Sequence, residues 1–129
     1  MVETRRAFHE ELEELNADVL RLAALATEAI QAGSAALLDF DLAGADKVIA
    51  DDKVIDELTH AMEEQVYLLL ARQQPMASDL RTLVSILRVI HELERVGDLM
   101  KNVAKATRSP ARRAPGLQQK RFKNDLRAG

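Results

Sequence analysis

The stretch that decides the fold is residues 78–107, which read SDLRTLVSILRVIHELERVGDLMKNVAKAT. Apolar residues recur in it at steps of three and four, the spacing of one face of an α-helix. This seam consists of Leu83, Ile86, Ile90, Leu93, Gly97, Met100 and Ala104. No proline interrupts it. We therefore expect one helix that ends near Thr107, with Ser78 as its N-cap and Asp79 at the positive end of the helix dipole.

Two similar seams precede this stretch. The first predicts a helix from about Val2 to Leu38, with Phe8, Leu12, Leu15, Val19, Leu22, Ala26, Ala29 and Gly33 on one face. The second predicts a helix that follows a candidate N-cap at Asp41, ends near Gln73 before Pro75, and carries Val48, Asp52, Ile55, Thr59, Met62, Val66 and Leu69 on one face. Because the connections are short, neighbouring helices should be antiparallel. The expected fold class is all-α, an antiparallel three-helix bundle.

Composition agrees with this fold class and excludes several kinds of site. The chain has 129 residues, of which 47% are apolar and only 3% aromatic, with five glycines and three prolines. It has no cysteine, which excludes disulfides, thiolate metal sites and cysteine nucleophiles. No apolar run has the length of a membrane span, and the polar start of the chain is unlike a secretory signal. We expect a cytoplasmic protein without direct membrane insertion.

Charge divides the chain into two parts. Residues 1–107 carry a net charge of −9 and residues 108–129 a net charge of +6, with breakers at Ser109-Pro110 and Pro115-Gly116. This shift predicts a helical body over 1–107 and a basic tail over 108–129 that does not pack firmly. Because basic residues in such a tail are weak evidence for nucleic-acid binding, we expect no nucleic-acid partner.

Acidic residues interrupt two of the seams. Asp52 occupies a seam position and Asp56 follows one turn later, while Glu94, Asp98 and Asn102 recur at steps of four. The two acidic pairs lie at equal distances from the turn near residue 75, so they should have the same height on antiparallel helices. Four converging carboxylates would be costly without a cation, and oxygen ligands suit iron, manganese, magnesium or zinc. The pattern is equally compatible with solvated or salt-bridged surface carboxylates.

Other candidate features are weaker. Glu57 and His60 have the Glu-x-x-His spacing of di-iron bundles, but Glu57 should face water. His91 lies one turn before Glu94, where it could bind metal or make a structural hydrogen bond. Gly97 in mid-helix indicates a close approach of helices beside the acidic cluster. The sequence contains no glycine-rich phosphate loop and no Ser-His-Asp arrangement, so nothing in it argues for catalysis.

Two motifs resemble those of a known family. Residues 71–81 read ARQQPMASDLR and residues 93–98 read LERVGD. Together they resemble the PhoU family of phosphate-uptake regulators, and the resemblance extends over residues 5–107. The turn motif, for which the resemblance suggests a role in the turn or in partner contacts, comprises Arg72, Gln73, Pro75, Asp79 and Arg81.

The resemblance carries expectations about function. In the family, paired acidic motifs support multinuclear iron or zinc clusters; here the matching residues are Asp52, Asp56, Glu94 and Asp98, with Asn102 as a further oxygen ligand. Manganese or magnesium would also suit these ligands. Family members are regulators and not enzymes. They restrain the phosphate-specific ABC transporter and phosphate-starvation signalling, so the implied partners are the transporter's ATPase subunit and the phosphate-responsive sensor histidine kinase.

The chain departs from the family pattern in length. Typical members have two tandem three-helix repeats, whereas this sequence has one repeat and then the basic tail, which suggests a single-repeat or truncated form. We expect two copies to form a homodimer that mimics the tandem arrangement. Two alternative functions remain: a metal-free helical adaptor whose acidic rows bind basic partners, and a carboxylate-bridged metalloenzyme, which the scarcity of histidine disfavours.

Overall fold

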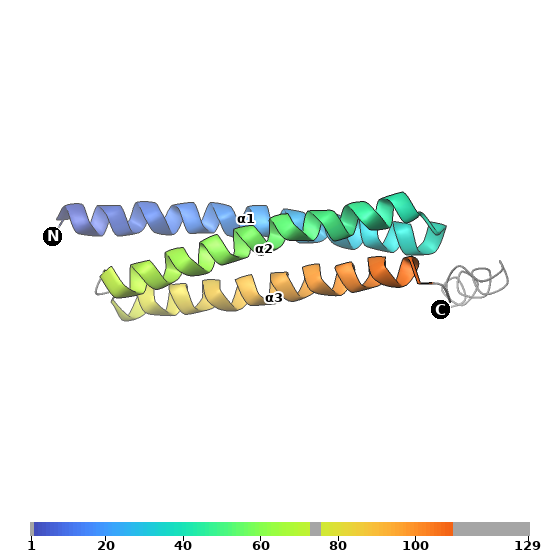
Figure 1. The fold of residues 1–129 in the computed structure, drawn as a ribbon. Coiled ribbons are helices and arrows are strands. Elements are labelled where there is room, and N and C mark those ends of the chain that lie inside the picture. The colour runs from blue at the N-terminus through green and yellow to red at the C-terminus, as the bar shows by residue number, and fades with distance from the viewer. Residues whose placement is uncertain (1, 73–75, 110–129) are drawn as a thin grey trace.

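Three α-helices form the described part of the chain, residues 2–72 and 76–109, in the computed structural model. They are α1 (Val2–Asp39), α2 (Leu42–Arg72) and α3 (Ala77–Thr107), and they run side by side, with α2 antiparallel to both neighbours (Figure 1). This arrangement confirms the expected all-α, antiparallel three-helix bundle. Most of the expected tail (108–129) and residues 73–75 of the turn motif lie outside the described residues.

The turn between α1 and α2 depends on two residues. Phe40 has a left-handed backbone conformation with φ of 54°, and this ends α1. The backbone N–H of Asp41 donates to the carbonyl of Ala36 at 2.9 Å. The Asp41 carboxylate accepts from the backbone N–H of Gly44 at 3.0 Å, which confirms Asp41 as the N-cap of α2.

The start of α3 differs from the prediction. Met76 and not Ser78 is the N-cap, and the carboxylate of Asp79 accepts a hydrogen bond from the Met76 backbone N–H at 3.3 Å. Ser78 lies inside the first turn, where its carbonyl accepts from the Thr82 hydroxyl. The helix begins at Ala77 because an acidic residue at its third position can reach back to the N-cap and satisfy a free N–H.

The core consists of two clusters of buried side chains. The larger one contains Phe8, Leu15, Leu22, Ile55, Met62, Val66, Leu69, Leu83, Ile86 and Ile90. The smaller one contains Ala36, Ala45, Val48, Met100 and Ala104, so that end of the bundle is filled mainly by small residues. Asp52 lies on α2 between Val48 of the smaller cluster and Ile55 of the larger one. A charged residue therefore occupies the junction of the two apolar clusters.

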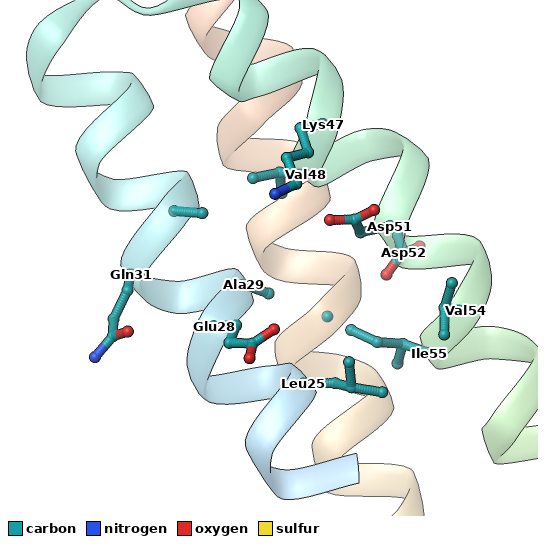
Figure 2. A pocket seen from close by; sticks show the side chains of 12 residues that line it. Leu25, Glu28, Ala29, Gln31, Lys47, Val48, Asp51, Asp52, Val54 and Ile55 are labelled. Carbon is teal, nitrogen blue, oxygen red and sulfur yellow. The ribbon is translucent and has the colours of Figure 1, made fainter. Parts of the chain in front are cut away.

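A cavity of about 550 Å³ lies between α1 and α2 beside this junction (Figure 2). Apolar side chains such as Leu25 and Ile55 share its wall with the charged Glu28, Lys47 and Asp51. Asp52 and Gly97 also line it. In the part of the chain that the structure describes, no helix has the length and apolar character required to cross a membrane.

Candidate metal centre

Asp52 is the buried carboxylate of the bundle at this height. Its side chain is only 3% exposed, because the seam position that it occupies on α2 faces the other two helices. Neither carboxylate oxygen has a hydrogen-bond partner among the described residues. Burying an ionised carboxylate without hydrogen bonds costs free energy, and a nearby cation would offset this cost.

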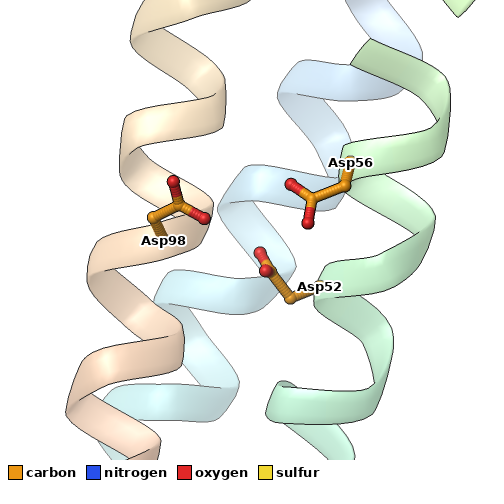
Figure 3. A group of neighbouring side chains, drawn as sticks. All are labelled: Asp52, Asp56 and Asp98. Atoms are coloured by element: carbon orange, nitrogen blue, oxygen red, sulfur yellow. The ribbon is translucent and has the colours of Figure 1, made fainter. Parts of the chain in front are cut away.

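Two further aspartates converge on Asp52. Asp56 follows one turn later on α2, and Asp98 approaches from α3 (Figure 3). Each of the three residues offers one carboxylate oxygen, and these atoms all lie within 4.8 Å of one another. We call Asp52, Asp56 and Asp98 the aspartate triad. The predicted equal height of the two acidic motifs is thus confirmed for these three residues.

Gly97 allows the two helices to approach at the triad. A Cβ atom at this position would lie 3.0 Å from Oδ1 of Asp52 and 3.3 Å from two side-chain carbons of Ile55. These separations are shorter than ordinary van der Waals contacts, so an alanine at this position would require Asp52 or Ile55 to shift by a few tenths of an ångström. The expected close approach beside the acidic cluster is therefore present.

The electrostatics of the triad disfavour three ionised carboxylates. Burial raises the pKa of Asp52 above its ordinary value of 3.8, and the neighbouring charges of Asp56 and Asp98 raise it further. Lys101 acts in the opposite direction. Its ammonium lies 3.6 Å from Oδ2 of Asp52, close enough for an ion pair but too long for a hydrogen bond.

Glu94 lies one turn before Asp98 on α3 and is half-buried. Burial raises its pKa above the ordinary value of 4.5, and the charges of Glu63, Asp56 and Asp98 add to the effect. His60 opposes it. Glu94 is therefore coupled electrostatically to the triad although it is not one of the three residues whose oxygens converge.

The remaining candidates lie around the triad. Asn102 is exposed one turn beyond Asp98, and its role as a ligand stays a prediction. Glu57 is exposed, as expected. His91 on α3 lies beside Glu63 on α2, with Nε2 3.1 Å from Oε1, so the structure gives it a carboxylate neighbour outside the triad.

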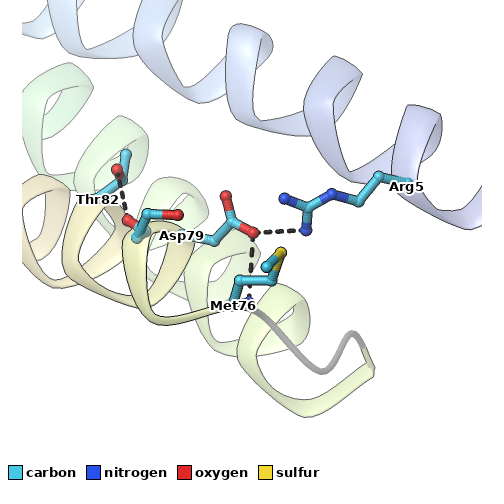
Figure 4. A network of polar contacts seen from close by, with 5 residues as sticks. Arg5, Met76, Asp79 and Thr82 are labelled. Atoms are coloured by element: carbon cyan, nitrogen blue, oxygen red, sulfur yellow. Dashed lines mark hydrogen bonds and ion pairs between the residues drawn. The ribbon is translucent and has the colours of Figure 1, made fainter.

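The turn motif is described only in part. Asp79 is buried, and its carboxylate pairs with the guanidinium of Arg5 on α1 as well as with the Met76 backbone N–H (Figure 4). It thus joins the starts of α1 and α3. Arg81 is exposed beside a groove between α1 and α3. Gln73, Pro75 and the side chain of Arg72 lie outside the described residues.

Sequence reasoning missed two residues of this region. Lys101 stands three positions after Asp98 and Glu63 stands seven after Asp56, and both spacings place residues on the same side of a helix. This spacing was the sequence feature that could have pointed to Lys101 and Glu63. It was not distinctive, because charged residues at the edge of an apolar seam usually point to solvent.

The triad fits a metal ion on the chemistry of its donors. It supplies converging carboxylate oxygens and no sulfur, which suits hard or borderline ions such as iron, manganese, magnesium and zinc. No hydrogen bond from the described residues engages the oxygens of Asp52, and Oδ2 has only the Lys101 ammonium at 3.6 Å, so both oxygens can act as ligands once that contact gives way. A cation at the triad would offset both the burial of Asp52 and the repulsion among the three carboxylates.

Comparison with known proteins identifies the relatives of the chain. The family model of the PhoU domain matches residues 19–107. A phosphate-specific transport system accessory protein PhoU homolog of Rhizobium meliloti (strain 1021) is 42% identical over 99 residues, which are 77% of this chain and 42% of that protein.

Two further relatives carry the same designation. The PhoU homolog 2 of Mycobacterium tuberculosis (strain ATCC 25618 / H37Rv) is 40% identical over 104 residues, 81% of this chain and 49% of that protein. The PhoU homolog 1 of Thermotoga maritima is 36% identical over 97 residues, 75% of this chain and 42% of that protein. The chain spans somewhat less than half the length of these curated relatives. On the match of the domain model and of these relatives, the chain belongs to the PhoU family.

Proposed function

We propose that this chain is an accessory protein of a phosphate-specific transport system and that it binds metal at the aspartate triad. The accessory role is taken from the relatives, whose names describe them as accessory proteins of that system. Metal binding is supported by one observation above all. Asp52 is buried, makes no hydrogen bond to a described residue, and faces two more carboxylates.

The ligands in this proposal are Asp52, Asp56 and Asp98, with Glu94 and Asn102 as further oxygen donors at the edge of the site. A bound ion would hold α2 and α3 together by neutralising charge that both helices contribute. Its role is structural and regulatory, so we propose that the chain is not an enzyme. Iron and zinc are the proposed ions, and manganese and magnesium suit the same oxygen donors.

The proposed regulation is negative. The chain would restrain phosphate uptake by contact with the ATPase subunit of the transporter, and it would restrain starvation signalling by contact with the sensor histidine kinase, in the cytoplasm. A strain that lacks its own PhoU protein tests this part. Expression of the chain should lower phosphate uptake and the output of a phosphate-starvation reporter, and no change in either measurement would contradict the regulatory role.

Metal content tests the triad. We expect tag-free protein reloaded with iron, manganese or zinc to hold about one or more equivalents by mass spectrometry, and Asp52→Asn with Asp98→Asn to lose most of this metal. A matched control is Asp51→Asn with Glu92→Gln, which removes the same charge from exposed positions on the same two helices. Equal metal content in all three proteins would contradict the proposed site. No metal in any of them would favour the metal-free adaptor.

A further inference from the structure

Lys101 is the basic residue that the structure pairs with the aspartate triad. It lies on α3 three positions after Asp98, and its ammonium is 3.6 Å from Oδ2 of Asp52. The Asp52 side chain is 3% exposed, whereas that of Lys101 is 33% exposed. The two partners therefore differ in freedom, because the carboxylate is enclosed in the bundle and the ammonium reaches it from the surface.

The ammonium and a metal ion would compete for the same oxygen. Metal–carboxylate bonds are about 2.0–2.6 Å long, so an ion bound to Oδ2 lies closer to that oxygen than Nζ does. Two cations at one carboxylate repel each other, and this repulsion is strengthened where water is excluded. Asp52 stays enclosed beside this conflict, because its side chain is only 3% exposed and its Oδ1 lies next to Gly97, 3.0 Å from the place that a Cβ would occupy there.

Lys101 can leave without disturbing the bundle. Its side chain has a flexible stem of four carbons, and a third of its surface already faces solvent. Its ion pair with Asp52 is longer than a hydrogen bond, so no directional bond must break. Once water surrounds the ammonium, its charge is screened from the site.

We propose that Lys101 is the built-in counter-cation of the metal-free site and that metal binding displaces it into solvent. This inference rests on the proposed metal function and adds a regulatory step to it. The ammonium partly compensates Asp52 when metal is scarce, and its removal is a cost that every metal ion must overcome. Loading of the triad is thereby coupled to the exposure of one lysine on the α2–α3 face.

A variant of Lys101 without the charge tests whether the ammonium opposes metal binding. Lys101→Met keeps the length of the stem and removes the ammonium, and Lys105→Met is the matched control, one turn further along α3 at an exposed position. We expect Lys101→Met to bind Mn²⁺ or Zn²⁺ about tenfold more tightly than the wild-type chain in calorimetric titrations of chelator-stripped protein. The Lys105→Met control should stay within about twofold of wild type.

The metal-free proteins should respond in the opposite direction. Without metal, we expect Lys101→Met to unfold at a lower temperature than wild type and Lys105→Met to unfold close to wild type, because only the first variant leaves Asp52 without its cation. A third variant, Lys101→Arg, keeps the charge and protects the test against failure of Lys101→Met to fold. Its guanidinium should preserve the wild-type stability and should not tighten metal binding.

Chemical labelling follows the displacement in the wild-type chain. Modification of Lys101 by an amine-reactive reagent, measured by peptide mass spectrometry, should accelerate when Mn²⁺ or Zn²⁺ is added, whereas modification of Lys105 should not. Wild-type metal binding with unchanged or weaker binding in Lys101→Met, or labelling that slows with metal, would overturn the role of Lys101 and leave the triad proposal standing. Failure of both wild type and Lys101→Met to bind metal would overturn both proposals.

Discussion

At the scale of single residues, Asp52 combines burial with repulsion from neighbouring carboxylates. Asp52 occupies a seam position that would hold an apolar side chain in an ordinary three-helix bundle, and it faces Asp56 and Asp98. Such a position is costly to the metal-free fold unless a cation compensates it. We therefore expect Asp52 to lower the free energy of unfolding of the metal-free protein.

The free energy of unfolding of the metal-free chain should depend on pH because of Asp52. The pKa of Asp52 is raised above 3.8 by burial and by its acidic neighbours, so between 3.8 and the raised native pKa the native state keeps a proton that the unfolded chain has released. Stability should therefore increase as the pH falls from neutral through the raised native pKa toward 3.8, and decrease as the pH rises through the same window. Glu94, whose pKa is also raised, adds to the effect above 4.5.

Urea unfolding of wild type and Asp52→Asn measures this contribution. At neutral pH the metal-free Asp52→Asn variant should be more stable than wild type by about 1 kcal/mol, and the difference should shrink as the pH approaches the ordinary pKa of an aspartate. Asp51→Asn, an exposed neighbour, serves as the control and should show no such trend. A variant that is less stable than wild type at neutral pH would show that the ion pair with Lys101 outweighs the burial of Asp52.

At the scale of the helices, periodicity and turn chemistry predicted most of the architecture. The predicted ends of the first and second helices lie within about one residue of the observed Asp39 and Arg72, and the third ends at Thr107 as expected. The start of α3 was wrong because a serine N-cap and an aspartate that reaches back to Met76 leave similar patterns in the sequence. Local rules locate a helix more reliably than they choose its cap.

The triad was predictable for a related reason. A fixed rise per residue on antiparallel helices determines which positions share a height, and this placed Asp98 opposite Asp52 and Asp56. The side-chain contacts around it were not predictable, because Lys101 and His91 have long or rotatable side chains whose partners depend on packing. Sequence spacing fixes where a Cβ points, and the direction of the charged end is decided by the neighbouring helix.

A side chain at Gly97 should weaken the packing of α2 against α3. Gly97→Ala gains about 1 kcal/mol of helix propensity, but its Cβ would meet Asp52 and the buried Ile55 at 3.0–3.3 Å. Overpacking of this kind costs about 1–3 kcal/mol, so we expect a net loss of about 1 kcal/mol in urea unfolding and weaker metal binding. Ser85→Ala, at an exposed position of α3, is the control for propensity alone. A more stable Gly97→Ala protein would mean that α2 and α3 separate easily at the triad.

At the scale of the whole molecule, apolar side chains remain on the surface of the bundle. Met76, Leu80 and Val84 are exposed and recur at steps of four, from the N-cap of α3 into the helix itself, so they form a row. The large exposed side chains Leu20 and Leu99 lie elsewhere, on α1 and on the later half of α3. Scattered apolar residues are normal on a protein surface, but a row on one helix is the kind of face that another copy of the chain can cover.

We therefore expect this row, which we call the α3 apolar row, to take part in a homodimer. Light scattering at tens of micromolar should give twice the mass of one chain. The reason is that an apolar helix face packed against its symmetry mate is removed from water, and this burial stabilises the dimer. Leu80→Glu with Val84→Glu should shift the protein to the monomer, because it places like charges on both sides of the two-fold interface. The control Leu20→Glu with Leu99→Glu adds the same charge outside the row and should leave the dimer intact.

A wild-type monomer at these concentrations would contradict self-association, and a dimer that survives Leu80→Glu with Val84→Glu would place the interface on another face. Helicity measured on each variant by circular dichroism separates loss of the dimer from loss of the bundle, which is expected to survive because Leu80 and Val84 lie outside the core.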